Sequence, residues 1–442
     1  MSRSLLEQAK AVVRQAQQLG AQGVRASLGR SRDSRVEWRD GELDRLREST
    51  RMSLGVTLFV DGRYSSNSTS DLRPAAVERF LQKTVAMTRV LAEDPHRQLP
   101  DPARTQQDFS GELGLYDEQG AGSVSAPERR RLAAALEQAA RSGPETDSII
   151  SVTASCSDSV SDSVLVTSNG MHNSRRSSTF ALFAETSVAD AGDRKPEGWD
   201  YAVVRRREAL PAIESIGAEA TRRARMGLGA EPAASGRYRC VIENRVVGRL
   251  LAWLLAPLSG RAIQQQASFL ADKKGQPILT EGLSITDDPF VVGGLGSRLY
   301  DGEGMARKKM PVFERGVLRN FYLDTYYASK LDMEPTSGSQ SNLVFNGGER
   351  DLAGLLQQMG TGILITGFSG GNSNAATGDF SIGVRGQWVE NGKIARPLAE
   401  MNLAGNHLSF WQQLAETGND PHIYSSWRTP SMRFDQVQFS GV

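Results

Sequence analysis

The sequence has few of the residues that bind metals or form disulfides. Its 442 residues include only two cysteines, Cys156 and Cys240. They show no C-x-x-C spacing and are too few for a disulfide scaffold, which fits a reducing compartment. There are four histidines, no two of them within two helical turns of each other: His96, His172, His407 and His422. No spacing typical of a metal site is present.

Long apolar runs and an excess of either charge are also missing. No run reaches the ~18 apolar residues of a membrane span, and Met1-Ser2-Arg3-Ser4 lacks the apolar core of a signal peptide. Lys plus Arg number 52 against 51 Asp plus Glu, without the basic excess of a nucleic-acid-binding protein. We therefore expect a soluble cytoplasmic protein with no membrane or nucleic-acid partner. The basic runs 129–131 and 205–207 are interpreted as solvated helix faces.

The length favours two domains, and the residue patterns favour an α+β fold. We place the boundary in the glycine-rich segment 226–236, giving domains 1–230 and 231–442. The first domain is predicted as helices and a strand meander, with hairpin turns at Asp40-Gly41 and Asp61-Gly62. Helices are predicted at 5–19, 75–91 (capped by Ser70-Asp71), 125–142 and 209–225, and strands at 24–28, 36–38, 54–60, 149–156, 163–167 and 179–187. Segment 94–122, poor in apolar residues, is predicted as a long surface connection.

Serines are dense between Ser151 and Ser163. A nucleophile is one interpretation, but no G-x-S-x-G motif and no nearby histidine accompany them. We interpret these residues as solvated strand edges, with a serine and aspartate turn between two strands.

The second domain opens with a short strand at 239–243 and a helix at 246–260. Seven apolar residues form one continuous stripe on this helix: Val246, Val247, Leu250, Leu251, Leu254, Leu255 and Leu258. The opposite face carries Arg249, Ala252, Trp253, Ala256 and Pro257. Proline lacks the N–H of a helical residue, so Pro257 should kink or thin the last turn.

Residues 361–404 are predicted as the C-terminal domain's large, mostly antiparallel, glycine-rich sheet. An apolar run at 363–365 precedes a loop of small polar residues at 367–377, and alternation resumes at Phe380. Asn391-Gly392 predicts a hairpin to the return strand. The glycine loop suits ordinary turns in a twisted sheet, or a channel that accepts an extended peptide beside a strand.

Two further pairs of residues allow a structural and a functional interpretation. Asp301-Gly302-Glu303-Gly304 is either a turn with solvated acids or part of a seam between subunits. His407 and Trp411 lie four apart on a predicted helix after Asn406, a spacing that favours packing over chemistry.

Over nearly its whole length the chain resembles the TldD/PmbA family, in particular its PmbA branch, also called TldE. The resemblance rests on motifs in order: LLAPLSG followed by SFL, YDGEGMA, MGTGILITG and TGDFSIGVRGQWVENGKIARPLAEMNLAGN. It implies a two-domain α+β fold and a cytoplasmic heterodimer of TldD-like and TldE-like chains acting as a zinc-dependent peptidase. Such a peptidase trims unfolded or leader peptides, including microcin-type precursors and an antitoxin.

In the TldD-type chain, the resemblance implies HExxxH on the helix that corresponds to 246–260 and a later cysteine ligand. Those motif positions are Ala252, Trp253 and Pro257 here, and no cysteine follows Cys240. Alanine and proline have no side-chain donor, and tryptophan cannot act as the general base. We therefore expect no metal and no cofactor in this chain, with zinc in its TldD-like partner.

The resulting hypothesis is a noncatalytic TldE-like subunit that shapes a chamber for extended peptides and supports its partner. Candidate residues for the peptide channel or the subunit seam are Asp301, Glu303, Gly304, Gly367, Gly370, Gly371, Gly378 and Asp379. Two alternatives stay open: a self-sufficient, homodimeric peptidase with an unrecognised site, and a peptide-binding module without peptidase activity.

Overall fold

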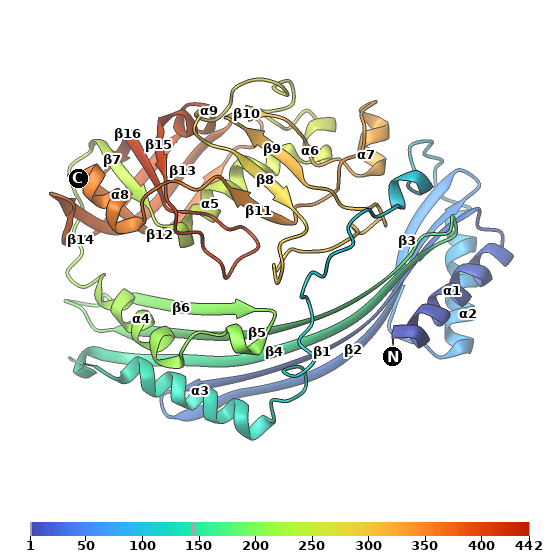
Figure 1. Ribbon diagram of the computed structural model, residues 1–442, viewed down its shortest axis with the longest axis horizontal. Helices are drawn as coiled ribbons and strands as arrows, with labels where there is room; N and C mark the ends of the chain where they lie inside the picture. The colour runs from blue at the N-terminus through green and yellow to red at the C-terminus, as the bar shows by residue number, and fades with distance from the viewer. Residues whose placement is uncertain (1, 144–145, 442) are drawn as a thin grey trace.

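A computed structural model describes residues 2–143 and 146–441. Figure 1 shows a long, strongly curved sheet with the second half of the chain lying over its concave side. Helices cover the opposite side of the sheet. The predicted α+β class is confirmed, because strands that are almost all antiparallel combine with packed helices in both halves.

The first half of the chain forms one antiparallel six-stranded sheet of order β3-β2-β1-β4-β5-β6. Its strands are β1 (Gly23–Arg39), β2 (Glu42–Val60), β3 (Arg63–Thr69), β4 (Ile149–Thr167), β5 (His172–Val188) and β6 (Glu197–Val204). Its helices are α1 (Ser2–Gln18), α2 (Pro74–Thr88), α3 (Ala126–Arg141) and α4 (Ile213–Arg225), with short 3-10 turns η1 (Pro102–Thr105), η2 (Thr146–Ser148) and η3 (Arg207–Ala209).

The predicted helices and both hairpin turns of this half are confirmed, but its strands are longer than predicted. β1 is continuous where two strands were expected, and β4 runs through the serine-rich segment with no turn. β4 also lies in the middle of the sheet, between β1 and β5, so the interpretation of its serines as strand edges was wrong. The α2 N-cap is Arg73, not Ser70 or Asp71.

The alternation of buried and polar residues explains both the length of these strands and the presence of serines within β4. Even-numbered residues of β1 and β4 pack under α1 to α4, among them Ala26, Val36, Ala154 and Val164. Odd-numbered residues therefore point to the concave side, where β4 presents its serines. Polar side chains on one face are compatible with a strand whose other face is buried.

Arg129 is a further correction, since it does not lie on a solvated helix face. Its side chain is buried beneath the sheet and forms a bidentate pair with Asp158, with Nη2 to Oδ2 at 3.0 Å. Arg205, in the second basic run, is also buried and lies outside any helix. Arg130 and Arg131 are exposed, as predicted.

The second half forms two sheets. A six-stranded sheet has the order β14-β13-β12-β7-β16-β15, and an added β14–β16 pairing curls it towards a barrel; a smaller sheet has the order β10-β9-β8-β11. The strands are β7 (Gly236–Ile242), β8 (Ile285–Asp288), β9 (Met310–Glu314), β10 (Val317–Leu318), β11 (Asn342–Phe345), β12 (Gly362–Ser373), β13 (Asp379–Glu390), β14 (Lys393–Asn406), β15 (Leu414–Thr417) and β16 (Met432–Ser440). The helices are α5 (Asn244–Leu255), α6 (Gly260–Gln264), α7 (Thr325–Lys330), α8 (Leu352–Met359) and α9 (His407–Phe410), with 3-10 turns η4 (Ala256–Leu258) and η5 (Trp411–Gln413).

The glycine-rich stretch folds into three strands and a hairpin, as predicted. Asn391 and Gly392 take φ values of 51° and 75° in the β13–β14 turn. The predicted loop at 367–377 is shorter than expected, because β12 continues to Ser373 through two bulges. Bulges let a strand absorb extra residues without ending its pairing.

α5 fills the centre of the second half. Its apolar stripe is buried, in agreement with the prediction: Val247, Leu250, Leu251, Leu254 and Leu255. Each such side chain contributes about 1.5–3 kcal/mol relative to an exposed position. The helix ends at Leu255, and Pro257 lies in the 3-10 turn η4, so the predicted thinning of the last turn is confirmed.

Direct contacts join the two halves. Arg25 of β1 lies 3.7 Å from Glu303, and Arg205 donates to the carbonyl of Leu295 at 2.5 Å. The segment 94–122 also bridges them, because the carbonyl of Leu113 accepts from the N–H of Gly293 at 2.7 Å (Figure 1). Within residues 2–143 and 146–441, no helix has the length and apolarity needed to cross a membrane.

Candidate functional site

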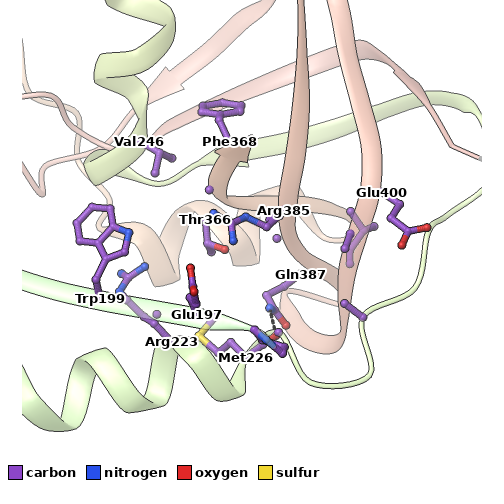
Figure 2. Close-up of a pocket in the computed structure, with 18 of the residues that line it drawn as sticks. Glu197, Trp199, Arg223, Met226, Val246, Thr366, Phe368, Arg385, Gln387 and Glu400 are labelled. Atoms are coloured by element: carbon purple, nitrogen blue, oxygen red, sulfur yellow. Dashed lines mark hydrogen bonds between the residues drawn. The ribbon is translucent and has the colours of Figure 1, made fainter. Parts of the chain in front are cut away.

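A cavity of about 760 Å³ lies at the junction of the two halves. β6 and the segment after α4 contribute residues from the first half, and α5, β12, β13 and β14 contribute residues from the second. Figure 2 shows Trp199, Val246 and Phe368 around one side of it and Gln387 and Glu400 towards the other. The cavity is therefore built from segments far apart in the sequence.

β12 presents a free backbone edge to this cavity. β7 pairs with β12 only from Ile363 to Ile365, in parallel. The segment after β7 then leaves the sheet. Its last hydrogen bond to β12 runs from the N–H of Glu243 to the carbonyl of Ile365, and α5 begins at Asn244. Beyond that point, no other strand of the described chain pairs with this side of β12. Unpaired N–H and C=O groups of this kind can bind an extended peptide.

Two guanidinium groups flank this edge. Gly367 pairs in register with Arg385 of β13, and a Cβ on Gly367 would lie 3.6 Å from Arg385 Nε. The Arg385 side chain therefore lies within contact distance of Gly367, and Figure 2 shows it extending towards Thr366. Arg249 of α5 reaches the edge from the other side, with Nη2 3.4 Å from the carbonyl oxygen of Gly370.

The other charged groups around the cavity are mostly paired. Arg245 contacts Asp200 at 2.6 Å, and Arg223 is paired with Glu243 and Glu219. Arg249 and Arg385, by contrast, have no ion pair with any residue of the described ranges. Three carboxylates also line the cavity: Asp190, which is paired with Arg194 at 3.3 Å, Glu197 and Glu400.

The three positions where a zinc motif was considered lie on α5 and in the 3-10 turn that follows it. Trp253 is partly exposed, and its ring lies 6.4 Å from that of Phe380 and 5.2 Å from the guanidinium of Arg249. Ala252 has no donor atom, and Pro257 is buried in η4. The chemistry of these side chains does not fit a zinc ion. Across residues 2–143 and 146–441, no group of three or more His, Cys, Asp and Glu side chains is placed to hold a metal ion.

Two of the histidines and both cysteines are buried. His407 is buried between Phe269 and Phe380 and hydrogen bonded to Trp411, which confirms its predicted packing role. His422 accepts or donates a hydrogen bond at 2.9 Å with Tyr201. Both cysteines are buried, and burial raises the pKa of Cys156 to about 11 and that of Cys240 still further. Thiolates are therefore disfavoured at both positions.

The predicted glycine and aspartate residues separate into two groups. Gly367 and Gly370 line the cavity. Gly371 and Gly378, with φ values of 92° and 84°, form the bulge and the turn that lead into β13. Asp379 accepts hydrogen bonds from Asn406 and Thr377, which lower its pKa, and it supports that turn outside the cavity lining.

The acidic turn at 301–304 lies at the contact between the two halves. Asp301 is buried and accepts from the N–H groups of Glu303, Gly304 and Met305 at 2.9, 3.1 and 3.0 Å. Burial raises the pKa of both Asp301 and Glu303. Their interpretation as solvated acids was therefore wrong. A role for them between subunits stays a prediction.

The sequence reasoning missed Arg385, Glu197 and Trp199 as cavity residues. The register between β12 and β13, which places Arg385 over Gly367, depends on two bulges that no residue pattern marks. The contribution of β6 depends on how the two halves meet. Neither the register of β12 and β13 nor the packing of the two halves can be inferred from local sequence.

Comparisons with known proteins agree along the chain. Residues 24–88, 120–228 and 235–441 match models described as PmbA/TldA metallopeptidase domain 1, central domain and C-terminal domain. The chain is 28% identical to Metalloprotease PmbA of Escherichia coli O157:H7, over 99% of this chain and 97% of that protein. It is 27% identical to a PmbA homologue of Haemophilus influenzae, over 90% and 88% of the two chains.

Solved structures show the same fold. A putative modulator of DNA gyrase from Bacteroides thetaiotaomicron is 36% identical, with a TM-score of 0.95 over 99% of this chain and 98% of that one. TldE from Thermococcus kodakarensis superposes with a TM-score of 0.88 at 19% identity, over 98% of this chain and all of that one. At that identity the second comparison concerns the fold alone.

Proposed function

This chain belongs to the PmbA/TldD metallopeptidase family, and on that premise we propose that it is the metal-free, TldE-type subunit of a two-chain peptidase. In this proposal a TldD-like partner holds the zinc ion and performs the hydrolysis. This chain contributes a wall of the peptide chamber and supports its partner. The complex acts in the cytoplasm on unfolded or leader peptides.

The observation that carries the proposal is the outward face of α5. At the motif positions it offers Ala252 and Trp253, with Pro257 following in η4, where a zinc peptidase needs imidazole donors and a carboxylate base. The cation beside the cavity on this helix is Arg249. A guanidinium group cannot replace a ligand, because it stays protonated and has no lone pair to offer.

The free edge of β12 supports a role in holding peptide. Main-chain hydrogen bonds along such an edge are the same for every sequence, so a chain added there is bound without strict side-chain selection. The broad concave sheet opposite, with its row of serines on β4, supplies a polar wall that offers few apolar anchors. A peptidase for unfolded chains needs binding of this permissive kind.

The test is to purify the chain alone, its TldD-like neighbour alone and the two together. We expect a one-to-one complex by size-exclusion chromatography and mass analysis. We expect stoichiometric zinc by elemental analysis in the partner and the complex, and far less than one zinc per chain in this subunit. Chelator-sensitive cleavage of an unfolded peptide should require the partner.

Two outcomes would favour the alternatives. Robust chelator-sensitive hydrolysis with stoichiometric zinc in the lone chain would indicate a self-sufficient peptidase. Peptide binding by this chain, with no complex formed and no cleavage in the mixture, would indicate a binding module without a peptidase.

A further inference from the structure

From the two unpaired guanidinium groups beside β12, we infer that the cavity selects extended peptide segments that carry carboxylates. This inference rests on the proposed peptide-binding role of the cleft and adds the class of peptide. Arg249 and Arg385 would bind carboxylates of the peptide while its backbone pairs with the free edge of β12.

The two arginines approach the same short strand from different elements. Arg385 Nε would lie 3.6 Å from a Cβ on Gly367, and Arg249 lies next to the carbonyl of Gly370. Neither has a carboxylate partner within residues 2–143 and 146–441, whereas Arg223 and Arg245 in the same cavity do. Guanidinium groups that keep free donors bind carboxylates with two parallel hydrogen bonds.

The spacing suits an extended ligand. Gly367 and Gly370 are three residues apart, or roughly 10 Å along a strand at ~3.3 Å per residue. Carboxylates two to four residues apart on an added strand span about 7–13 Å, so one peptide can reach both arginines. Phe368 and Val246 also line the cavity and offer apolar contact to other side chains of the peptide.

The carboxylates that line the cavity would oppose the binding of acidic peptides. Glu197 comes from β6 and Glu400 from β14, and Figure 2 shows Glu400 on the far side of Arg385 from Thr366. They do not pair with Arg249 or Arg385. Figure 2 shows the Glu197 carboxylate pointing towards Thr366, so the preference for peptide carboxylates depends on Arg249 and Arg385, the two guanidinium groups that lie at β12.

The experiment measures binding to the full-length chain by fluorescence anisotropy at low salt. The probes are labelled ten-residue peptides with Asp at positions 3, 5 and 7, and matched peptides with Asn or Lys there. We expect the Asp peptide to bind about tenfold more tightly than the Asn peptide, a difference of ~1.4 kcal/mol. Added salt should reduce this difference.

Variants assign the preference to the two residues. The double variant Arg249→Gln with Arg385→Gln should bind the Asp and Asn peptides equally. The charge reversal Arg249→Glu with Arg385→Glu should favour the Lys peptide, a gain that misfolding cannot mimic. Arg237→Gln, at an exposed position of β7 outside the cavity lining, is the matched control and should keep the preference.

Equal affinity for the Asp and Asn peptides, or no binding of any peptide at ~1 mM, would overturn the inference. So would a double Gln variant that keeps the Asp preference. These outcomes are separable from the proposed function, because complex formation with a TldD-like chain and the zinc content are measured independently. A complete complex without acidic selectivity rejects only this inference.

Discussion

The indole N–H of Trp411 donates to Nδ1 of His407 at 3.2 Å in the interior of the second half of the chain. An indole can only donate, so Nδ1 must be unprotonated and the ring proton lies on Nε2, facing Ser373 Oγ at 3.2 Å. A charged imidazolium would direct an N–H at the indole N–H. Burial lowers the pKa of His407 to about 4 from its usual 6.5.

This arrangement predicts how stability depends on pH. The unfolded chain binds a proton at His407 near pH 6.5 and the folded chain only near pH 4, so the free energy of unfolding falls as pH drops through that window. At pH values below the pKa of the folded state, one such histidine lowers the free energy of unfolding by ~3 kcal/mol. His422, whose pKa is also lowered to about 4 by burial and by Arg245 and Arg223, adds to it.

Urea unfolding between pH 7.5 and 4.5 checks this prediction. His407→Gln should unfold with a shallower pH dependence than the parent chain, whatever its stability at neutral pH. His172→Gln, at an exposed position, should leave the dependence unchanged. Parallel curves for His407→Gln and the parent would contradict the argument.

The buried pair of Arg129 with Asp158 predicts a large effect from one arginine of a basic run. Arg129→Ala leaves a buried carboxylate without its partner, and we expect a loss of about 3–5 kcal/mol in the free energy of unfolding. Arg130→Ala removes an exposed neighbour and should change stability by less than about 0.5 kcal/mol. Similar urea midpoints for the two variants would refute the structural assignment.

Arg129 also shows where sequence reasoning reaches its limit. Helix periods, Asp-Gly and Asn-Gly turns and the apolar stripe of α5 are local patterns, and they predicted the helices of the first half, α5 and the three strands β12 to β14. They gave no prediction for the small sheet β8 to β11 or for β15 and β16. Arg129 was assigned to solvent because a run of arginines gives no sign of a carboxylate 29 positions later. That carboxylate, Asp158, belongs to the part of β4 that was predicted as a turn between two strands.

The residues of the candidate site also divide into those that local sequence predicted and those that it missed. Gly367 and Gly370 were predicted because a glycine-rich loop after an apolar run is visible locally. Arg385 was missed because its position over Gly367 follows from bulged pairing. Asp301 was misplaced in solvent because its burial depends on the contact between the two halves of the chain.

The contact between the two halves predicts different effects for two glycines of one turn. Gly304 has φ of 95°, and a Cβ there would lie 2.9 Å from Met171 Sδ of the first half. We expect Gly304→Ala to destabilise the turn by about 1–2 kcal/mol. Gly302→Ala, with nothing within 4 Å of its Cβ position, should be close to neutral.

Hydrogen exchange of the segment 300–306 reports on this turn directly. Faster exchange of the Glu303, Gly304 and Met305 amides, which bond to Asp301, is expected in Gly304→Ala and not in Gly302→Ala. Equal protection in both variants would show that the turn tolerates a side chain facing Met171.

The edge of the first sheet predicts where the proposed TldD-like partner would bind. β3 covers β2 only from Leu54 to Val60, so the edge of β2 over 42–53 pairs with no other strand of the described chain. Three apolar side chains are exposed along it, those of Leu43, Leu46 and Met52.

An open edge with apolar side chains invites pairing with a strand of another chain. If the TldD-like partner supplies that strand, Leu46→Lys combined with Met52→Lys should weaken the complex at least about tenfold, or ~1.4 kcal/mol, in titration calorimetry. Ile423→Lys, at an exposed apolar residue of a loop, is the matched control and should bind normally. Undiminished affinity of the double variant would place the partner elsewhere, because two added charges on a buried edge cannot be accommodated without cost.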